Sequence, residues 1–173
     1  MTAAFSTSGS RASVALIDAG RTLYEGDETA QGRAGKACLR LLDDGLAQIG
    51  IDLTDIDLFA ADLGPGSFTG VRVGIVLAKT LAWQQGSLCA GADAFDLVAA
   101  DRTVALPSRK GEWFVRVPGQ EPERTKAMPE DVGVPLASGF AQLELKSISP
   151  YVLVPAYLLE PSISKPKVAY GRA

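Results

Sequence analysis

The spacing of apolar residues over the first half of the chain predicts strands followed by a helix. Three short β-rich runs come first, at residues 3–6, 12–18 and 22–26, and turn residues separate them. Such runs joined by tight turns are typical of an antiparallel meander. From residue 33 to 49 the spacing changes to the i, i+3, i+4 period of an amphipathic helix. Its apolar positions are Cys38, Leu41, Leu42, Gly45, Leu46 and Ile49.

Strands and helices then alternate. The pattern predicts a strand at 57–62, a helix at about 69–85, a short strand at 87–90 and a third helix at 92–100. Strands separated by helices of this length pair in parallel through crossover connections. We therefore expect a mixed α/β sheet with a leading meander and helices on its faces.

Apolar runs become sparse after residue 101. Strands are predicted at 104–106, 112–117 and 152–159, whereas the Pro- and charge-rich stretch 118–135 is predicted to be a loop. Residues 162–173 are predicted to form a polar tail. This half holds too few apolar runs for a large independent domain.

A glycine-rich turn, GPGSFTG, joins the strand before it to the helix after it. Gly64, Gly66 and Gly70 permit a sharp turn and a close backbone approach, with a positive φ expected at Gly66, and Ser67 or Thr69 is a candidate N-cap. A helix start offers free N–H groups and a positive dipole end to an anion, so these five residues are candidates for nucleotide binding. The alternative is a turn that serves packing alone, and no standard nucleotide-binding motif is present.

The helix after this turn is apolar on nearly every side, with only Arg72, Lys79 and Thr80 interrupting. A helix apolar all round must be buried all round. The first helix could cover part of it and a partner protein the rest, although both faces could also be covered within the chain. The predicted partner interface comprises Cys38, Leu41, Leu42, Gly45, Leu46, Val71, Val73, Gly74, Leu77, Ala78 and Leu81.

Composition excludes several classes of function. The 173 residues contain no histidine, which excludes Ser-His-Asp, Cys-His and HExxH chemistry, and no metal site is expected. The net charge is −3 without a basic tract, so the chain is a poor stand-alone RNA binder. Cys38 and Cys89 are expected to be buried small hydrophobes.

Neither a signal peptide nor a membrane span is expected. The first 16 residues lack a basic segment followed by a long apolar run. The longest apolar stretch, residues 71–83, is too short to cross a bilayer. We therefore expect a cytoplasmic protein without membrane contact.

The segment GPGSFTGVRVGIVLAKTLA, residues 64–82, resembles the signature of the TsaB (YeaZ) family. This family is the dimerisation subunit of the bacterial machinery for tRNA threonylcarbamoyladenosine modification. Other segments are similar to the family in the same order: TSGSRASVAL at 7–16, SRKGEWF at 108–114 and VPAYLLEP at 154–161. The resemblance covers most of the chain.

The resemblance implies an actin/Hsp70-like (ASKHA, ribonuclease H-like) α/β fold. Residues 1–100 would form the first lobe, with the dimerisation helices, and residues 101–173 a reduced second lobe and tail. It further implies a non-catalytic, glycoprotease-like paralogue of the TsaD transferase subunit. Its partners would be a TsaD-type subunit and a TsaE-type ATPase, with a homodimer when alone and tRNA reached only indirectly. No cofactor is required, and ATP or ADP at a subunit interface is left open.

One departure from the family bears on nucleotide binding. The family carries an Asp just before the Thr-Ser pair, where this chain has Ser6. Serine is a weaker ligand than a carboxylate for a nucleotide's metal. The alternative function is a glycoprotease-like hydrolase or a nucleotide-dependent ASKHA enzyme, for which Asp62 is the best-placed acid. The simpler interpretation of Asp62 is a carboxylate that caps a turn, and no catalytic residue is assigned.

Overall fold

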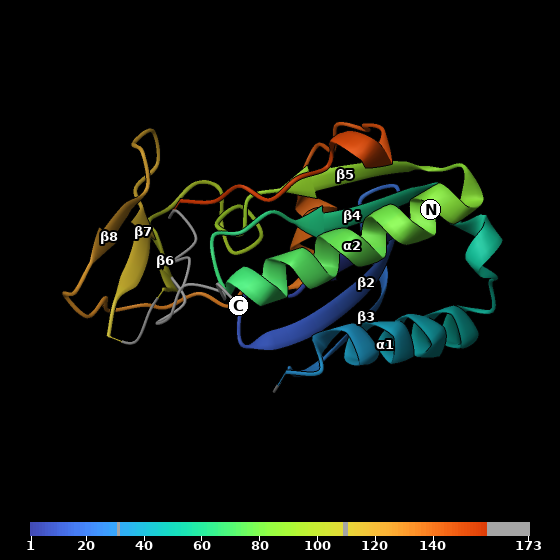
Figure 1. Cartoon of the computed structure of the whole chain (residues 1–173), viewed down its shortest axis with the longest axis horizontal. Helices are drawn as coiled ribbons and strands as arrows, with labels where there is room; N and C mark the ends of the chain where they lie inside the picture. Colours follow the sequence, from blue (N-terminus) through green and yellow to red (C-terminus); the bar gives the residue numbers. More distant parts are fainter. Residues whose placement is uncertain (31, 109–110, 159–173) are drawn as a thin grey trace, which may run out of the picture.

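The computed structural model describes residues 1–30, 32–108 and 111–158. Its main sheet contains β1 (Thr2–Ser6), β2 (Arg11–Asp18), β3 (Arg21–Thr29), β4 (Leu58–Asp62) and β5 (Leu88–Ala92). The long helices are α1 (Ala34–Ile49) and α2 (Phe68–Gln85). The strand order is β3-β2-β1-β4-β5, with β1 to β3 antiparallel and β1, β4 and β5 parallel (Figure 1). The predicted meander and mixed sheet are confirmed.

The two faces of this sheet carry side chains of different size. Alternate residues of a strand point to opposite faces. Phe5, Leu16 and Phe59 join the core beneath α1 and α2. Alanines such as Ala4 and Ala60 lie on the other face and contact a short 3₁₀ helix, η2 (Ala137–Gln142). The small side chains let this segment approach the sheet closely.

Both helices begin and end near the predicted positions. The buried face of α1 consists of Ala37, Cys38, Leu41, Leu42, Gly45 and Leu46. That of α2 consists of Val71, Gly74, Ile75, Ala78 and Ala82. Burial raises the pKa of the Cys38 thiol to about 12 and that of the Cys89 thiol to about 11, and both cysteines are free, as expected.

A smaller antiparallel sheet lies beside the main one, at the left of Figure 1. It contains β6 (Val104–Pro107), β7 (Trp113–Arg116) and β8 (Glu123–Thr125). The first two strands were predicted, whereas β8 falls in the stretch predicted as loop. Two further 3₁₀ turns are η1 (Leu53–Asp55) and η3 (Pro150–Val152). The chain then returns to the main sheet through η2 and η3. The predicted division into two lobes at residue 100 stays a prediction.

The third helix predicted at 92–100 is wrong, because this segment forms successive turns. β5 continues to Ala92, and the Ala94 N–H donates to the Gly64 carbonyl at 2.7 Å. The Asp93 carboxylate accepts the Phe95 N–H at 2.8 Å. The apolar pattern of this segment predicted a helix. The hydrogen bond to the glycine-rich turn and the capping by the Asp93 carboxylate favour turns instead.

The last predicted strand, at 152–159, is also wrong within its described part. The segment runs along α2, where Lys79 Nζ donates to the Leu153 carbonyl at 3.1 Å, and reaches the end of β4, where the Ala156 N–H donates to the Leu63 carbonyl at 2.8 Å. Its remaining position, Leu159, lies outside the described residues, as does the tail predicted at 162–173. None of the helices in the described ranges combines the length and apolarity that crossing a membrane requires.

Candidate functional site

The glycine-rich turn lies against the loop between β1 and β2. Gly64 has a φ of +88°, in the left-handed region that favours glycine. The positive φ expected at Gly66 is wrong: this residue is needed for space, because a Cβ there would collide with the Ser8 carbonyl. A Cβ on Gly70 would collide with the Thr7 carbonyl in the same way. The turn therefore depends on close backbone approach at two of its glycines.

Thr7 connects this loop to the first turns of α2. Its side chain is buried, and its Oγ1 donates to the Gly70 carbonyl at 2.7 Å and accepts the Gly74 N–H at 3.0 Å. Ser67 is the N-cap of α2, as predicted, and its hydroxyl accepts the Gly70 N–H at 3.2 Å. The start of α2 is thus fixed to both the loop and the turn.

Asp62, at the end of β4, accepts hydrogen bonds from the same loop. Its Oδ2 accepts hydrogen bonds from Ser6 Oγ at 2.5 Å, the Thr7 N–H at 2.9 Å and the Ser8 N–H at 3.1 Å. Burial raises the pKa of this carboxyl, and the hydrogen bonds oppose the rise. Asp62 Oδ1 and Ser8 Oγ are buried and have no hydrogen-bond partner among the described residues. The geometry matches the turn-capping interpretation.

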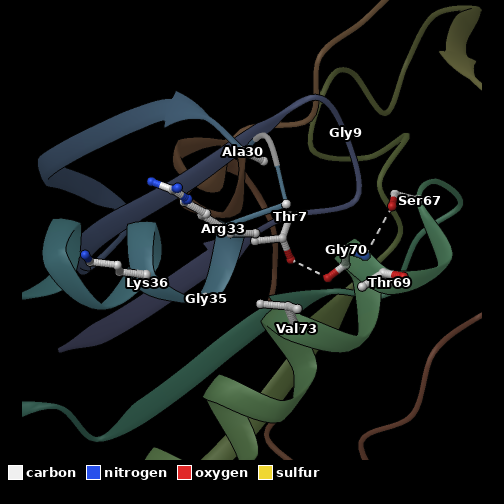
Figure 2. A pocket seen from close by; sticks show the side chains of 12 residues that line it. Thr7, Gly9, Ala30, Arg33, Gly35, Lys36, Ser67, Thr69, Gly70 and Val73 are labelled. Carbon is white, nitrogen blue, oxygen red and sulfur yellow. Dashed lines mark hydrogen bonds between the residues drawn. The ribbon is translucent and has the colours of Figure 1, made fainter.

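A pocket of about 420 Å³ opens where the N-termini of α1 and α2 converge (Figure 2). Among the predicted nucleotide-binding residues, Ser67, Thr69 and Gly70 line it. Gly64 and Gly66 are not in its lining, because they form the turn that supports it. The other lining residues are Thr7, Gly9, Ala30, Gly32, Arg33, Ala34, Gly35, Lys36 and Val73.

The charge of this pocket favours an anion. The N-cap of α1, Arg33, makes no side-chain capping bond, and the first turn of α1 has no acidic residue. Arg33 and Lys36 line the pocket, and none of the described residues that line it is acidic. Uncapped N–H groups suit a phosphate or carboxylate, whereas the charged ends of Arg33 and Lys36 extend away from Thr7 and Gly70 (Figure 2). Within the described ranges, no cluster of His, Cys, Asp or Glu could hold a metal ion.

The outward side of α2 is the second feature of interest. The alternative that both faces of α2 are covered within the chain is wrong: Phe68, Val76 and Trp83 are 40%, 59% and 66% exposed. Shallow grooves of about 430 Å³ and 690 Å³ flank the ridge formed by Arg72 and Val76, which line both. We call Phe68, Arg72, Val76 and Trp83 the α2 ridge.

The predicted interface residues are mostly in the chain's own core. Those that are buried are Cys38, Leu41, Leu42, Gly45, Leu46, Val71, Gly74 and Ala78. They pack against the sheet, so they are corrected from interface to core residues. Val73, Leu77 and Leu81 are partly buried. Contact between these helices and a partner stays a prediction, and the ridge is the part of α2 free to make it.

Sequence reasoning passed over the ridge because it counted apolar residues without assigning them to faces. Phe68, Arg72 and Val76 recur at intervals of four, which places them on one side of a helix. Tyr157, from a segment far away in sequence, completes this surface by stacking on Phe68. The spacing could have revealed the ridge, whereas nothing local could have revealed Tyr157.

Comparisons with known proteins find similarity to proteins of tRNA threonylcarbamoyladenosine biosynthesis. Residues 28–100 match the family model of TsaD, tRNA N6-adenosine threonylcarbamoyltransferase. The chain is 39% identical over 120 residues to the tRNA threonylcarbamoyladenosine biosynthesis protein TsaB of Haemophilus influenzae, covering 64% of this chain and 50% of that protein. It is 52% identical over 44 residues to TsaB of Escherichia coli, covering 25% and 19%. Together these matches support the TsaB/YeaZ family.

The fold of this chain is similar to that of a YeaZ protein of known structure. YeaZ from Pseudomonas aeruginosa superimposes with a TM-score of 0.75 at 21% identity, covering 91% of this chain and 99% of that one. The ASKHA-like α/β fold and the TsaB/YeaZ resemblance are therefore confirmed. The chain spans about half the length of the H. influenzae TsaB that it matches. The TsaB/YeaZ family takes part in tRNA threonylcarbamoyladenosine biosynthesis.

Proposed function

We propose that this chain is a non-catalytic scaffold that binds a TsaD-type transferase subunit through the outward side of α2. The α2 ridge is the observation that carries this proposal. The exposed side chains of Val76 and Trp83, on a helix that is already packed on its sheet, contribute little to the stability of the monomer. Burying one of them in an interface contributes about 1.5–3 kcal/mol. A ridge flanked by grooves is a surface of the kind that protein partners use.

Further aspects of the proposal follow from the family. A scaffold of this kind would hold the transferase subunit in its active arrangement and meet a TsaE-type ATPase in the same complex. It would reach tRNA only through these partners, since the chain has 20 acidic and 17 basic residues. Without its partner, the ridge would pair with a second copy as a two-fold dimer.

Binding of the purified TsaD-type subunit by isothermal titration calorimetry tests this proposal. We expect Val76→Glu to lose at least about 100-fold in affinity, because a carboxylate would replace apolar contact area at the interface and, four positions after Arg72, would itself occupy that guanidinium. Met128→Glu is the matched control, since Met128 is 81% exposed and belongs to neither α1 nor α2. Equal binding by Val76→Glu, or no binding by the wild type, contradicts the proposal. Leu42→Glu is unsuitable, because Leu42 is 2% exposed and the variant should unfold.

A second proposal concerns nucleotide binding. The cationic pocket at the starts of α1 and α2 would take the phosphates of ATP or ADP, completed by a partner subunit. Calorimetric titration of each nucleotide into the chain alone and into its complex measures this. Arg33→Gln combined with Lys36→Gln should weaken binding, whereas Arg102→Gln, in an exposed pair with Asp131, should not. Absence of heat in both titrations contradicts this second proposal.

A further inference from the structure

Arg72 on the α2 ridge packs against a stacked pair of aromatic rings, Phe68 and Tyr157. The centre of its guanidinium lies 3.9 Å from the centroid of the Phe68 ring and 5.8 Å from that of Tyr157. The two rings stack with centroids 5.3 Å apart and an interplanar angle of 28°. Arg72 Nε also donates to the Tyr157 hydroxyl at 2.7 Å. The side chain therefore has a defined orientation although it lies at the surface.

The two outer nitrogens of this guanidinium are available for recognition. Nε is the only nitrogen of Arg72 with a hydrogen-bond partner among the described residues, and none of their carboxylates pairs with it. A planar guanidinium matches the two oxygens of a carboxylate. Because the rings already restrict the side chain, little conformational entropy is lost when such a partner binds.

The surroundings of Arg72 are cationic and apolar. The sequence of α2 contains Arg72 and Lys79 and no acidic residue, and among the residues that the structure describes none that lines either flanking groove is acidic. This differs from the chain as a whole, which has a net charge of −3. Val76 and Val154 lie next to it and are both exposed. The site combines a single oriented cation with apolar contact area.

We propose that Arg72 is the receptor for a carboxylate of the protein partner that docks on the α2 ridge. The partner would supply an Asp or Glu flanked by apolar residues, so that the carboxylate meets the guanidinium and its neighbours cover Val76 and Val154. Arginine and tyrosine at the centre of an interface commonly carry much of its binding energy. This inference rests on the proposed function. An RNA phosphate fits less well, because backbone binding uses many cations and this surface has two.

Calorimetric binding of the purified TsaD-type subunit, at low and high salt, tests the inference. We expect Arg72→Gln to weaken binding by at least about tenfold and to reduce its salt dependence, because the charge pair is removed. Arg72→Lys should restore only part of the affinity, since an ammonium keeps the charge but not the planar geometry. Arg102→Gln is the control, an exposed arginine in the region of the smaller sheet. Circular dichroism checks that each variant is folded.

The outcomes separate the inference from the proposed function. If Val76→Glu abolishes binding while Arg72→Gln binds with wild-type affinity and salt dependence, the partner docks on α2 but places no carboxylate on Arg72. If Arg72→Lys binds as tightly as the wild type, the planar match is contradicted. If neither ridge variant changes binding, the proposed surface fails as a whole. Loss of tRNA binding in Arg72→Gln, with protein binding intact, would assign the cation to RNA instead.

Discussion

At the scale of single residues, Asp62 organises the loop between β1 and β2. Its Oδ2 accepts from one hydroxyl and two backbone N–H groups, all of them buried. Asp62→Ala leaves the two N–H groups unpaired, whereas Ser6 Oγ keeps the Pro135 carbonyl at 2.9 Å, so we expect a loss of about 2–4 kcal/mol in the free energy of unfolding. Asp62→Asn keeps an acceptor oxygen and should cost less. Urea unfolding measures both, and Asp131→Ala, at an exposed ion pair, should change stability by less than about 0.5 kcal/mol.

The same residue should make stability depend on pH. Burial raises the pKa of Asp62 in the folded state above its value in the unfolded chain. Between these two values the folded state binds more protons, so this contribution to stability falls as pH rises through that window. Asp62→Asn cannot ionise and should gain stability relative to the wild type over the same rise. A difference between the two proteins that does not change as the pH rises would contradict this.

An enzymatic role for Asp62 remains the alternative to the scaffold. Incubation of the pure chain with ATP or with a glycoprotein tests it directly. We expect no turnover, because the carboxyl is buried and occupied by the loop it holds. Turnover that disappears in Asp62→Asn would instead identify an enzyme.

Residue roles were predictable from the sequence where the interaction is local. Ser67 was one of two N-cap candidates, with Thr69, and it caps α2 by accepting the N–H of Gly70, three positions ahead. The hydrogen-bond network of Asp62 could not be predicted from the sequence. Its partners are 54 to 56 positions away and meet it only after β1 and β4 pair. For the same reason Gly66 was assigned a left-handed conformation, when the real constraint is the Ser8 carbonyl next to it.

At the scale of elements, the junction between the glycine-rich turn and α2 requires close approach. Gly70→Ala would place its Cβ against the Thr7 carbonyl, a backbone atom that cannot move aside easily. We expect a loss of roughly 1–3 kcal/mol, as for other overpacked sites. Gly35→Ala is the matched control, because its Cβ would make an ordinary 3.5 Å contact with Val73 and alanine favours the helix. Thermal unfolding should show a lower midpoint for Gly70→Ala only; equal midpoints would remove the steric argument.

Element prediction succeeded where apolar periodicity was clear. α1 shows a distinct apolar stripe, and its predicted face is the one that packs on the sheet. α2 shows no distinct stripe, because apolar residues continue around it. The helix itself was therefore predicted, but the face that packs on the sheet was not. The turns after β5 were mistaken for a helix because their hydrogen bonds involve the glycine-rich turn and the Asp93 side chain.

At the scale of the whole molecule, the mixed sheet could be predicted because each crossover follows from a strand and a helix of suitable length. The return of the chain to this sheet through η2 and η3 could not be predicted. η2 covers the alanine-rich face of the sheet, and η3 with the segment after it lies along α2. These contacts join residues more than 70 positions apart and have no periodic signal. They also bring Tyr157 to Arg72, which builds the surface on which the proposed function depends.

Site-specific photo-crosslinking tests most directly whether that surface meets the transferase subunit. A photoreactive residue would replace Val76, and in a separate protein Met128, before mixing with the purified TsaD-type subunit and irradiation. We predict a covalent heterodimer from position 76 and none from position 128, because only the first lies on the α2 ridge. A crosslink from position 128 alone, or none from position 76 at a concentration where the wild types form a complex, would contradict the account.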